Sequence, residues 1–387
     1  MFLHIGLPKT GTSYLQTILW GNREALEQSG VRLPGVKRRD HLWASCVVRG
    51  DGNIGRRHSQ APDSWDRLVA DCAGWDHDAV ISHEFFSSAS TAQAAAAVGR
   101  LAPAEVHVVV TARDTLDLFT SSWQESVKNK GTTPMDEYGT SVSDNPLEVW
   151  DWRALDLGLV LERWATAVPA DRLHVLPLAR TGSAPEDLWG RLATLIGVPA
   201  GSVDVSQGFA NRSLGLVETE TLRRINTIVE GFDRPIDRGV WIRTFLADER
   251  LVPHGGERFW PLPAQIADCR ARGARAVALV RERGFDVRGS LEDLLTPDSL
   301  PVRRQPGSVT DTEVAGVAID LAGTLLGDIR RLTRELAEER DREPQPVDTP
   351  PPTPPRAHRS LTLAGALVAR ARRSRRSTDE AAAGAPR

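Results

Sequence analysis

The N-terminal segment FLHIGLPKTGTS constrains the fold more than any other part of the chain. Its apolar start, which ends in Gly6, is typical of a buried strand, and the residues from Ser13 to Gly30 repeat apolar side chains as one helical face does. Between strand and helix, Gly6 and Gly11 have the separation of a nucleotide-binding P-loop. We therefore expect an α/β protein built around a strand, a tight loop and a helix.

Further apolar runs predict strands that alternate with helices. They are AVISHEFF, EVHVVVTAR and RLHVLPL, with a shorter candidate, VRLP, after Gly30. Strands that alternate with helices in this way form parallel sheets. The predicted fold is a three-layer α/β/α fold around a central parallel sheet of about five strands, followed by a C-terminal helical extension. Residues 35–66 show no clear period.

Four regions follow from changes in composition along the chain. We expect one domain over 1–295, a helical extension over 296–343, a proline-rich linker over 344–358 and a basic, disordered tail over 359–387. Apolar residues at alternating spacings of four and three over 318–336 form a short heptad seam, through which the chain could oligomerise. The tail's arginines and leucines fit either peripheral contact with an anionic membrane or a solvated end.

Composition excludes several classes of function. A formal net charge of −3 gives no whole-chain reason to expect a nucleic-acid partner. The three cysteines lack the spacing of a zinc site or a disulfide framework, so we expect reduced thiols and no metal. There is no signal-peptide pattern and no apolar run of the ~18 residues that a membrane span needs. These features favour a cytoplasmic protein.

The glycine loop departs from an NTPase P-loop in the place of its lysine. A Walker A motif has lysine directly after the second glycine, where this chain has Thr12, and the lysine, Lys9, lies inside the loop. Anion capture remains possible, because backbone amides at a helix start, with the hydroxyls of Thr10, Thr12 and Ser13, can hold a phosphate. Lys9, one of only four lysines in the chain, adds a positive charge.

The string PKTGTS resembles the loop with which sulfotransferases bind the 5'-phosphosulfate of 3'-phosphoadenosine 5'-phosphosulfate (PAPS). The longer segment HIGLPKTGTSYLQ is especially similar to the bacterial members of that family. The resemblance covers about residues 1–295. It implies an enzyme that transfers a sulfuryl group from PAPS to a hydroxyl or amine without a metal. It also implies that the donor is bound by Pro8, Lys9, Thr10, Gly11, Thr12 and Ser13.

The same family grips the 3'-phosphate of its donor with an arginine at a strand end and a serine eight residues later. Here VVVTAR ends at Arg113, and Ser121 stands eight residues on. A guanidinium offers two parallel donors to a phosphate, and the serine adds a neutral one. A weaker resemblance extends to the segment GFANRSLG, where Asn211, Arg212 and Ser213 match a loop near the nucleotide in bacterial members.

For catalysis we expect Lys9 to neutralise the charge that grows on the leaving phosphate, and a general base to take the acceptor's proton. The strand end ISHEFF supplies His83 and Glu84 where parallel sheets present ligand-binding groups. Neighbouring strand residues face opposite ways, so only one of the two should point at the acceptor. Resemblance to carbohydrate-type members favours Glu84. His41 and His58 are alternatives.

The acceptor is not identified by any motif, and carbohydrates, lipids and small metabolites all fit. One rival is a P-loop small-molecule kinase, which would need a lysine after Gly11 and an acidic magnesium ligand at a strand end. A second rival is a nucleotide-binding or scaffold protein without catalysis.

Overall fold

A computed structural model describes residues 1–180, 186–206 and 213–342. Its centre is one parallel sheet of six strands in the order β2-β3-β1-β4-β5-β6. The strands are β1 (Phe2–His4), β2 (Val31–Arg32), β3 (Asp78–Ser82), β4 (His107–Ala112), β5 (Leu173–Pro177) and β6 (Asp286–Val287). The predicted α/β class and parallel sheet are confirmed. The sixth strand, β6, was not predicted, because it has two half-buried residues and no apolar run.

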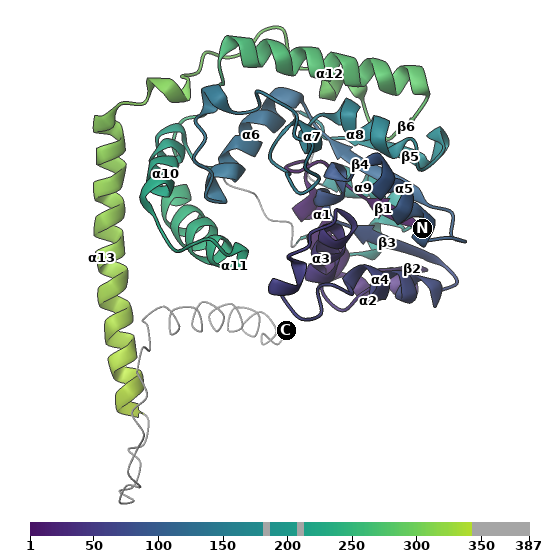
Figure 1. Ribbon diagram of the computed structural model, residues 1–387, viewed down its shortest axis with the longest axis horizontal. Helices are drawn as coiled ribbons and strands as arrows, with labels where there is room; N and C mark the ends of the chain where they lie inside the picture. The colour runs from purple at the N-terminus through teal and green to yellow at the C-terminus, as the bar shows by residue number, and fades with distance from the viewer. Residues whose placement is uncertain (181–185, 207–212, 343–387) are drawn as a thin grey trace, which may run out of the picture. The chain divides into compact units, whose positions relative to one another are not determined.

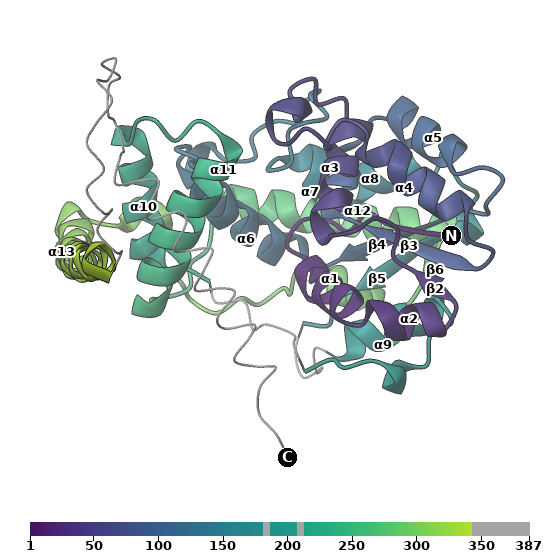
Figure 2. The same cartoon turned by 90° about the horizontal axis from the view of Figure 1, so that it is seen from below.

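Helices cover both faces of the sheet, so the fold has three layers (Figures 1 and 2). One face carries α1 (Thr12–Gly21), α2 (Arg23–Gln28) and α9 (Glu186–Leu195). The other carries α3 (Arg38–Val48), α4 (Ser64–Ala73), α5 (Thr91–Arg100), α7 (Trp152–Leu155) and α8 (Leu157–Trp164). Beside these lie α6 (Thr115–Lys128), α10 (Leu216–Ile228), α11 (Pro235–Asp237), a π-helix (Arg238–Leu251) and α12 (Pro263–Arg283).

The largest apolar core joins the first of these helical layers to the sheet. It includes Leu15, Ile18 and Leu19 from α1, which have no exposed surface, packed with Val80 of β3 and Val109 of β4. Burial of five such side chains stabilises the layer by several kcal/mol, at about 1.5–3 kcal/mol each. The apolar spacing that predicts the helix therefore also fixes which of its faces meets the sheet.

The structure corrects several predicted helices. The helix expected over 13–30 is interrupted at Asn22, whose amide donates to the carbonyls of Ile18 (2.9 Å) and Asp204 (2.8 Å) and so ends α1. The segment 35–66, which shows no period, contains α3 and the start of α4. The helix expected near 240–249 is a π-helix.

The chain divides into two compact units, Met1–Ala318 and the residues from Ile319 onward. Helix α13 (Asp311–Arg342) begins in the first unit. The division lies beyond the predicted boundary at residue 296, because the intervening segment is tied to the first unit. Its Arg304 carbonyl accepts from the Trp260 amide (3.0 Å), and its Pro301 carbonyl accepts from the Trp260 indole (2.8 Å).

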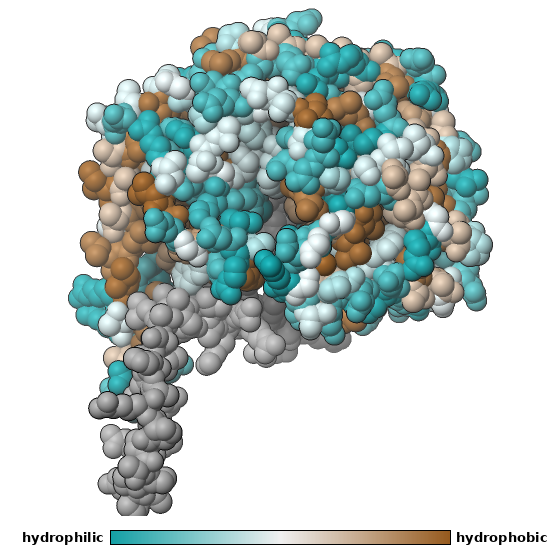
Figure 3. All heavy atoms as spheres, viewed as in Figure 1, coloured by the Kyte–Doolittle hydropathy of each residue, from teal (hydrophilic) through white to brown (hydrophobic). Residues whose placement is uncertain are grey.

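Helix α13 has exposed apolar side chains, and one of them, Ile329, belongs to the predicted seam. Ile319, Leu326 and Ile329 are 70%, 68% and 55% exposed, and hydrophobic surface is visible along this helix in Figure 3. The predicted linker and basic tail lie outside the described residues. None of the helices in the described ranges is both long enough and apolar enough to cross a membrane.

Candidate functional site

The candidate site lies at the carboxyl edge of the central strands. The glycine loop leaves β1, the segment of His83 and Glu84 leaves β3, and Arg113 leaves β4. Because β1 lies between β3 and β4, these three connections meet at one edge of the sheet. The strand order also reverses at β1, and such switch points are where α/β proteins bind ligands.

Three residues of the glycine loop have a left-handed backbone conformation, and the loop packs closely against its neighbours. Gly6, Lys9 and Gly11 have φ angles of 51°, 66° and 82°. A left-handed conformation is ordinary for glycine, whereas for lysine it costs on the order of 1 kcal/mol. At Gly6 an added Cβ would stand 2.5 Å from the Thr12 methyl and 3.3 Å from the Glu84 Cβ. The loop therefore packs directly against Glu84.

The start of α1 offers its amides to a ligand. Gly11 precedes the helix, and no side chain caps it. Thr12, the first helical residue, is buried, whereas Ser13 is exposed. Uncapped amides at a helix start carry a partial positive charge that favours anions. Pro8 is buried in the loop.

A directional chain of hydrogen bonds holds the loop from beneath. The Thr10 hydroxyl donates to the Leu7 carbonyl (2.6 Å) and therefore accepts from Thr111 (2.7 Å), since a hydroxyl has one hydrogen. Thr111 in turn accepts from His4 Nε2 (3.2 Å), and His4 Nδ1 accepts from Ser82 (2.8 Å). This order requires a neutral His4, and burial lowers the His4 pKa to about 4.

That chain revises the expected role of Thr10. We expected its hydroxyl to face a phosphate, but it is fully buried and its hydrogen is used within the loop. Thr10 shapes the loop from inside, and its side chain is not available to a ligand.

Lys9 is held by a carboxylate that the sequence did not single out. Its amine lies 2.9 Å from Glu125 Oε2 on α6, and the other oxygen of Glu125 pairs with Arg243 of the π-helix. Glu125 is only 2% exposed. Burial alone would raise the Glu125 pKa, but Lys9 and Arg243 outweigh burial and lower it. One ionised carboxylate thus pairs with two cations beside the loop and offsets the charge of only one of them.

The predicted second donor site lies on the same face of α6. Arg113 pairs with Asp117 (3.1 Å), and Ser121 and Glu125 follow at successive intervals of four residues. Residues four apart lie above one another on a helix. The Arg113 guanidinium also reaches the Lys9 carbonyl, at 3.5 Å. The structure therefore brings Arg113 to the glycine loop, and Ser121, which is half-buried, lies between Asp117 and Glu125 along α6.

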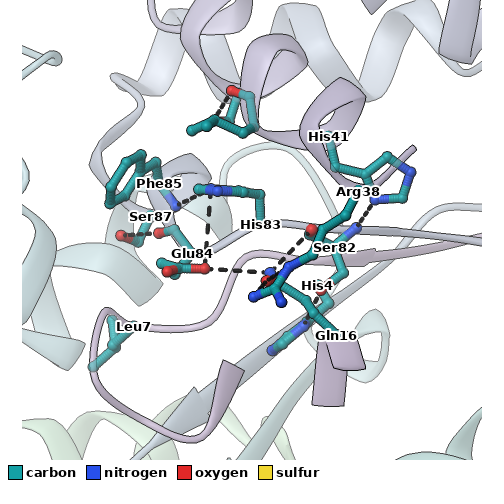
Figure 4. Close-up of polar contacts among 12 residues, drawn as sticks. His4, Leu7, Gln16, Arg38, His41, Ser82, His83, Glu84, Phe85 and Ser87 are labelled. Carbon is teal, nitrogen blue, oxygen red and sulfur yellow. Dashed lines mark hydrogen bonds and ion pairs between the residues drawn. The ribbon is translucent and has the colours of Figure 1, made fainter. Parts of the chain in front are cut away.

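The two candidate bases differ in what their side chains already bind (Figure 4). His83 Nδ1 accepts from the Phe85 amide (3.1 Å), so the proton of a neutral His83 is on Nε2. Burial lowers the His83 pKa to about 4, which keeps the ring neutral. Its one lone pair is therefore in use. Glu84 Oε2 accepts from Gln16 Nε2 (3.2 Å) and lies 4.0 Å from His83 Nδ1.

Glu84 is an ionised carboxylate in a largely buried position. Burial would raise its pKa, but His83, Arg38 and the Gln16 amide together lower it. The premise that His83 and Glu84 both lie on the strand was wrong, because β3 ends at Ser82 and a 3-10 turn begins at Glu84. Both side chains therefore lie at the same edge.

The alternative histidines are less suited to proton transfer. His41 is fully buried, accepts from the Ser82 amide at Nδ1 (3.1 Å) and bonds the Pro34 carbonyl at Nε2 (2.8 Å). His58 is exposed and stacks on Trp43, with ring centroids 4.8 Å apart. Both nitrogens of His41 are thus occupied.

The remaining predictions concern the segment from Asn211 to Ser213, metal binding and the cysteines. Asn211 and Arg212 lie outside the described residues, and Ser213 is exposed shortly before α10. Within the described ranges, no group of three or more His, Cys, Asp or Glu side chains could hold a metal ion. The three cysteines are unpaired.

Four residues of this edge were missed from the sequence: Gln16, Arg38, Glu125 and Arg243. Glu125 had a usable signal, since it extends the spacing of four from Arg113 through Ser121. Gln16, Arg38 and Arg243 had no such signal, because their partners are distant along the chain.

Neither a protein-family model, nor a curated protein, nor a solved structure matches this chain.

Proposed function

We propose that this protein is a sulfotransferase that moves a sulfuryl group from PAPS to a hydroxyl or amine of an acceptor. One observation carries the proposal. Arg113 contacts the glycine loop at the Lys9 carbonyl, so two anion-binding motifs with the spacing of this family adjoin at one sheet edge. A donor with a phosphosulfate at one end and a 3'-phosphate at the other needs two such sites in contact.

The two motifs divide the donor between them. The amides at the start of α1, with Lys9, would bind the 5'-phosphosulfate, because both carry positive charge at the loop. Arg113 and Ser121 would bind the 3'-phosphate, the guanidinium through two parallel hydrogen bonds. These residues supply the charge that holds the donor, so binding does not require magnesium.

Transfer is an in-line displacement at sulfur. Glu84 takes the proton of the acceptor hydroxyl as its oxygen bonds to sulfur, and the bond from sulfur to the bridging phosphate oxygen breaks. Adenosine 3',5'-bisphosphate leaves with the bonding electrons, and Lys9 neutralises the charge on the oxygen that leaves. Glu84 suits the role better than His83, whose lone pair already accepts from the Phe85 amide.

The kinase rival shares part of this geometry. Glu84 is an acid at a strand end beside the loop, which is the kind of group that binds magnesium in P-loop kinases. What favours the sulfotransferase is the loop lysine, since Thr12 occupies the position where a Walker A lysine would stand. A non-catalytic nucleotide-binding protein would have no need for an ionised Glu84 against the loop.

The decisive experiment is a calorimetric titration with adenosine 3',5'-bisphosphate in the presence of EDTA. We expect binding without magnesium and weaker binding of ATP. Arg113→Ala should weaken binding of the bisphosphate by about 2 kcal/mol, roughly 30-fold, because the guanidinium contact with the phosphate is lost and the Asp117 carboxylate is left unpaired beside it. Arg100→Ala, which breaks an exposed ion pair with Asp66, is the matched control. Absolute magnesium dependence, or equal affinity for ATP, would overturn the proposal.

A further inference from the structure

Arg38, the first residue of α3, lies beside the proposed base without a carboxylate partner. Its Nε and Nη2 both donate to the side-chain oxygen of Gln16, at 3.0 and 2.7 Å. The nitrogen of the same amide donates to Glu84 (3.2 Å). One neutral amide therefore separates a guanidinium from the carboxylate of the base, as Figure 4 shows.

No carboxylate of the described residues contacts Arg38 directly. Within the described part of the chain Arg38 forms no ion pair, and the charge that acts on it is that of Glu84. The side chain is exposed. It also lies near His83, whose protonated form it disfavours. A guanidinium has five donors, and the two contacts with Gln16 leave others free.

Stability of the helix does not explain this arginine. Cations at a helix start oppose the helix dipole, typically by a few tenths of a kcal/mol. The neighbouring Lys37 is used differently, since its amine lies 4.8 Å from the Trp43 ring centroid. Asp40, the acid of this turn, accepts from the amides of Val36 and Lys37. Arg38 is thus oriented by Gln16 toward the reacting edge at some cost to the helix.

We infer that Arg38 is an oxyanion-binding subsite for the acceptor. The inference rests on the proposed function and names the class of acceptor: a molecule that carries a carboxylate, phosphate or sulfate group close to the hydroxyl or amine that is sulfated. With that hydroxyl on Glu84, a neighbouring oxyanion meets the free donors of Arg38. A bidentate contact of this kind fixes orientation as well as affinity.

The alternative role for Arg38 is to tune the base, because its charge lowers the pKa of Glu84. The two roles have different consequences. Tuning affects every acceptor equally and moves the acid limb of the pH profile. Recognition affects anionic acceptors and leaves neutral ones unchanged.

The test separates acceptors by charge before the reaction. A metabolite extract is passed over an anion-exchange resin, and the retained and unretained fractions are each incubated with radiolabelled PAPS and the full-length protein. We expect label transfer with the retained fraction. Arg38→Gln should lower that transfer at least tenfold, and Arg38→Lys should restore part of it. Arg39→Gln, at the exposed neighbouring position, is the matched control and should keep the wild-type rate.

The other possible outcomes each contradict the role inferred for Arg38. Transfer that follows the unretained fraction, or an unchanged rate in Arg38→Gln, overturns the inference and leaves the proposed function standing. An equal loss on both fractions, with a shifted acid limb, assigns Arg38 to tuning of the base and also overturns it. No labelling in either fraction overturns it as well. Titration of the wild-type protein with adenosine 3',5'-bisphosphate then shows whether the proposed function fails too. The role inferred for Arg38 does not involve the donor, so bisphosphate binding tests the proposed function independently of Arg38.

Discussion

The two sides of the candidate site hold their charges in different ways. On the donor side each cation has a carboxylate partner, Lys9 with Glu125 and Arg113 with Asp117. On the acceptor side Arg38 is held by a neutral amide instead. An anion that approaches Lys9 or Arg113 must compete with a carboxylate or share its cation. One that approaches Arg38 meets no carboxylate in direct contact with it, since the Gln16 amide lies between Arg38 and Glu84. On the proposed donor side Lys9 and Arg113 are therefore in direct contact with carboxylates before a ligand binds, whereas Arg38 on the proposed acceptor side is not.

Lys9→Ala tests the donor side most severely. Loss of the only cation inside the loop should lower the rate of sulfuryl transfer roughly 100- to 1000-fold, as removal of a donor to a developing oxyanion does. It should also weaken bisphosphate binding. Lys130→Ala is the matched control, because Lys130 shares the left-handed conformation but pairs with the exposed Asp233. Transfer above a tenth of the wild-type rate in Lys9→Ala would contradict this role.

Glu84→Gln tests the acceptor side. The substitution keeps the shape and removes the basicity, so we expect about a 100-fold loss of transfer. Because Glu84 does not bind the donor, calorimetry should find the bisphosphate affinity unchanged. His83→Gln provides the comparison and should retain more activity. The assignment of the base would reverse if His83→Gln were the more damaging change.

Glu125→Gln sharpens the idea of competition. Removing one buried negative charge from beside Lys9 and Arg243 should tighten bisphosphate binding by about 1 kcal/mol, roughly fivefold, at low ionic strength. Asp248→Asn, which removes a partner of Lys128, should have a smaller effect. Weaker binding in Glu125→Gln would mean that this carboxylate orients Lys9 and does not compete with the ligand.

The buried histidines give the smallest effect near neutral pH. Burial lowers the pKa values of His4, His41 and His83 to about 4, against an ordinary 6.5. The stability that they support is complete above pH 6.5 and is lost as the pH falls toward 4, because the unfolded chain takes up protons first. Each histidine should cost about 1 kcal/mol by pH 5.5.

Urea unfolding at pH 7 and pH 5.5 measures that loss. Replacing His41 by glutamine should reduce the difference between the two pH values. Replacing the exposed His58 should not. Equal pH dependence in all three proteins would show that other groups dominate the acid response.

The fold was largely predictable from the sequence because its strands are apolar runs. Strand β4 is buried along five of its residues, and no polar pattern obscures it. By contrast β6 has two residues and depends on pairing with β5, which no local pattern reveals. The end of α1 at Asn22 likewise depends on the distant carbonyl of Asp204.

The site was predictable where its residues lie in one local motif. Lys9 through Ser13 form one continuous stretch from the loop into the start of α1, and Ser121 lies on α6, which begins two residues after Arg113. Gln16 and Arg38 could not be found in this way, because they belong to the site only through their position beside Glu84, which is far along the chain. The inward hydroxyl of Thr10 was hidden for a similar reason: its partner Thr111 belongs to β4.

The hydrogen-bond chain from Ser82 through His4 and Thr111 to Thr10 bears on the thermodynamics of donor binding. A loop that is ordered only by its ligand loses backbone entropy when it binds, about 1 kcal/mol or more for each residue that becomes fixed. Here the turn is anchored to β4 through Thr111, and from there to β1 and β3 through His4 and Ser82, by contacts that a ligand on its outer surface does not break. Most of that entropy has already been lost in folding. Association should therefore carry a small conformational entropy penalty, and the Leu7 amide, which donates to the Thr111 carbonyl (2.9 Å), should be protected from hydrogen exchange in the free protein as well as in the complex.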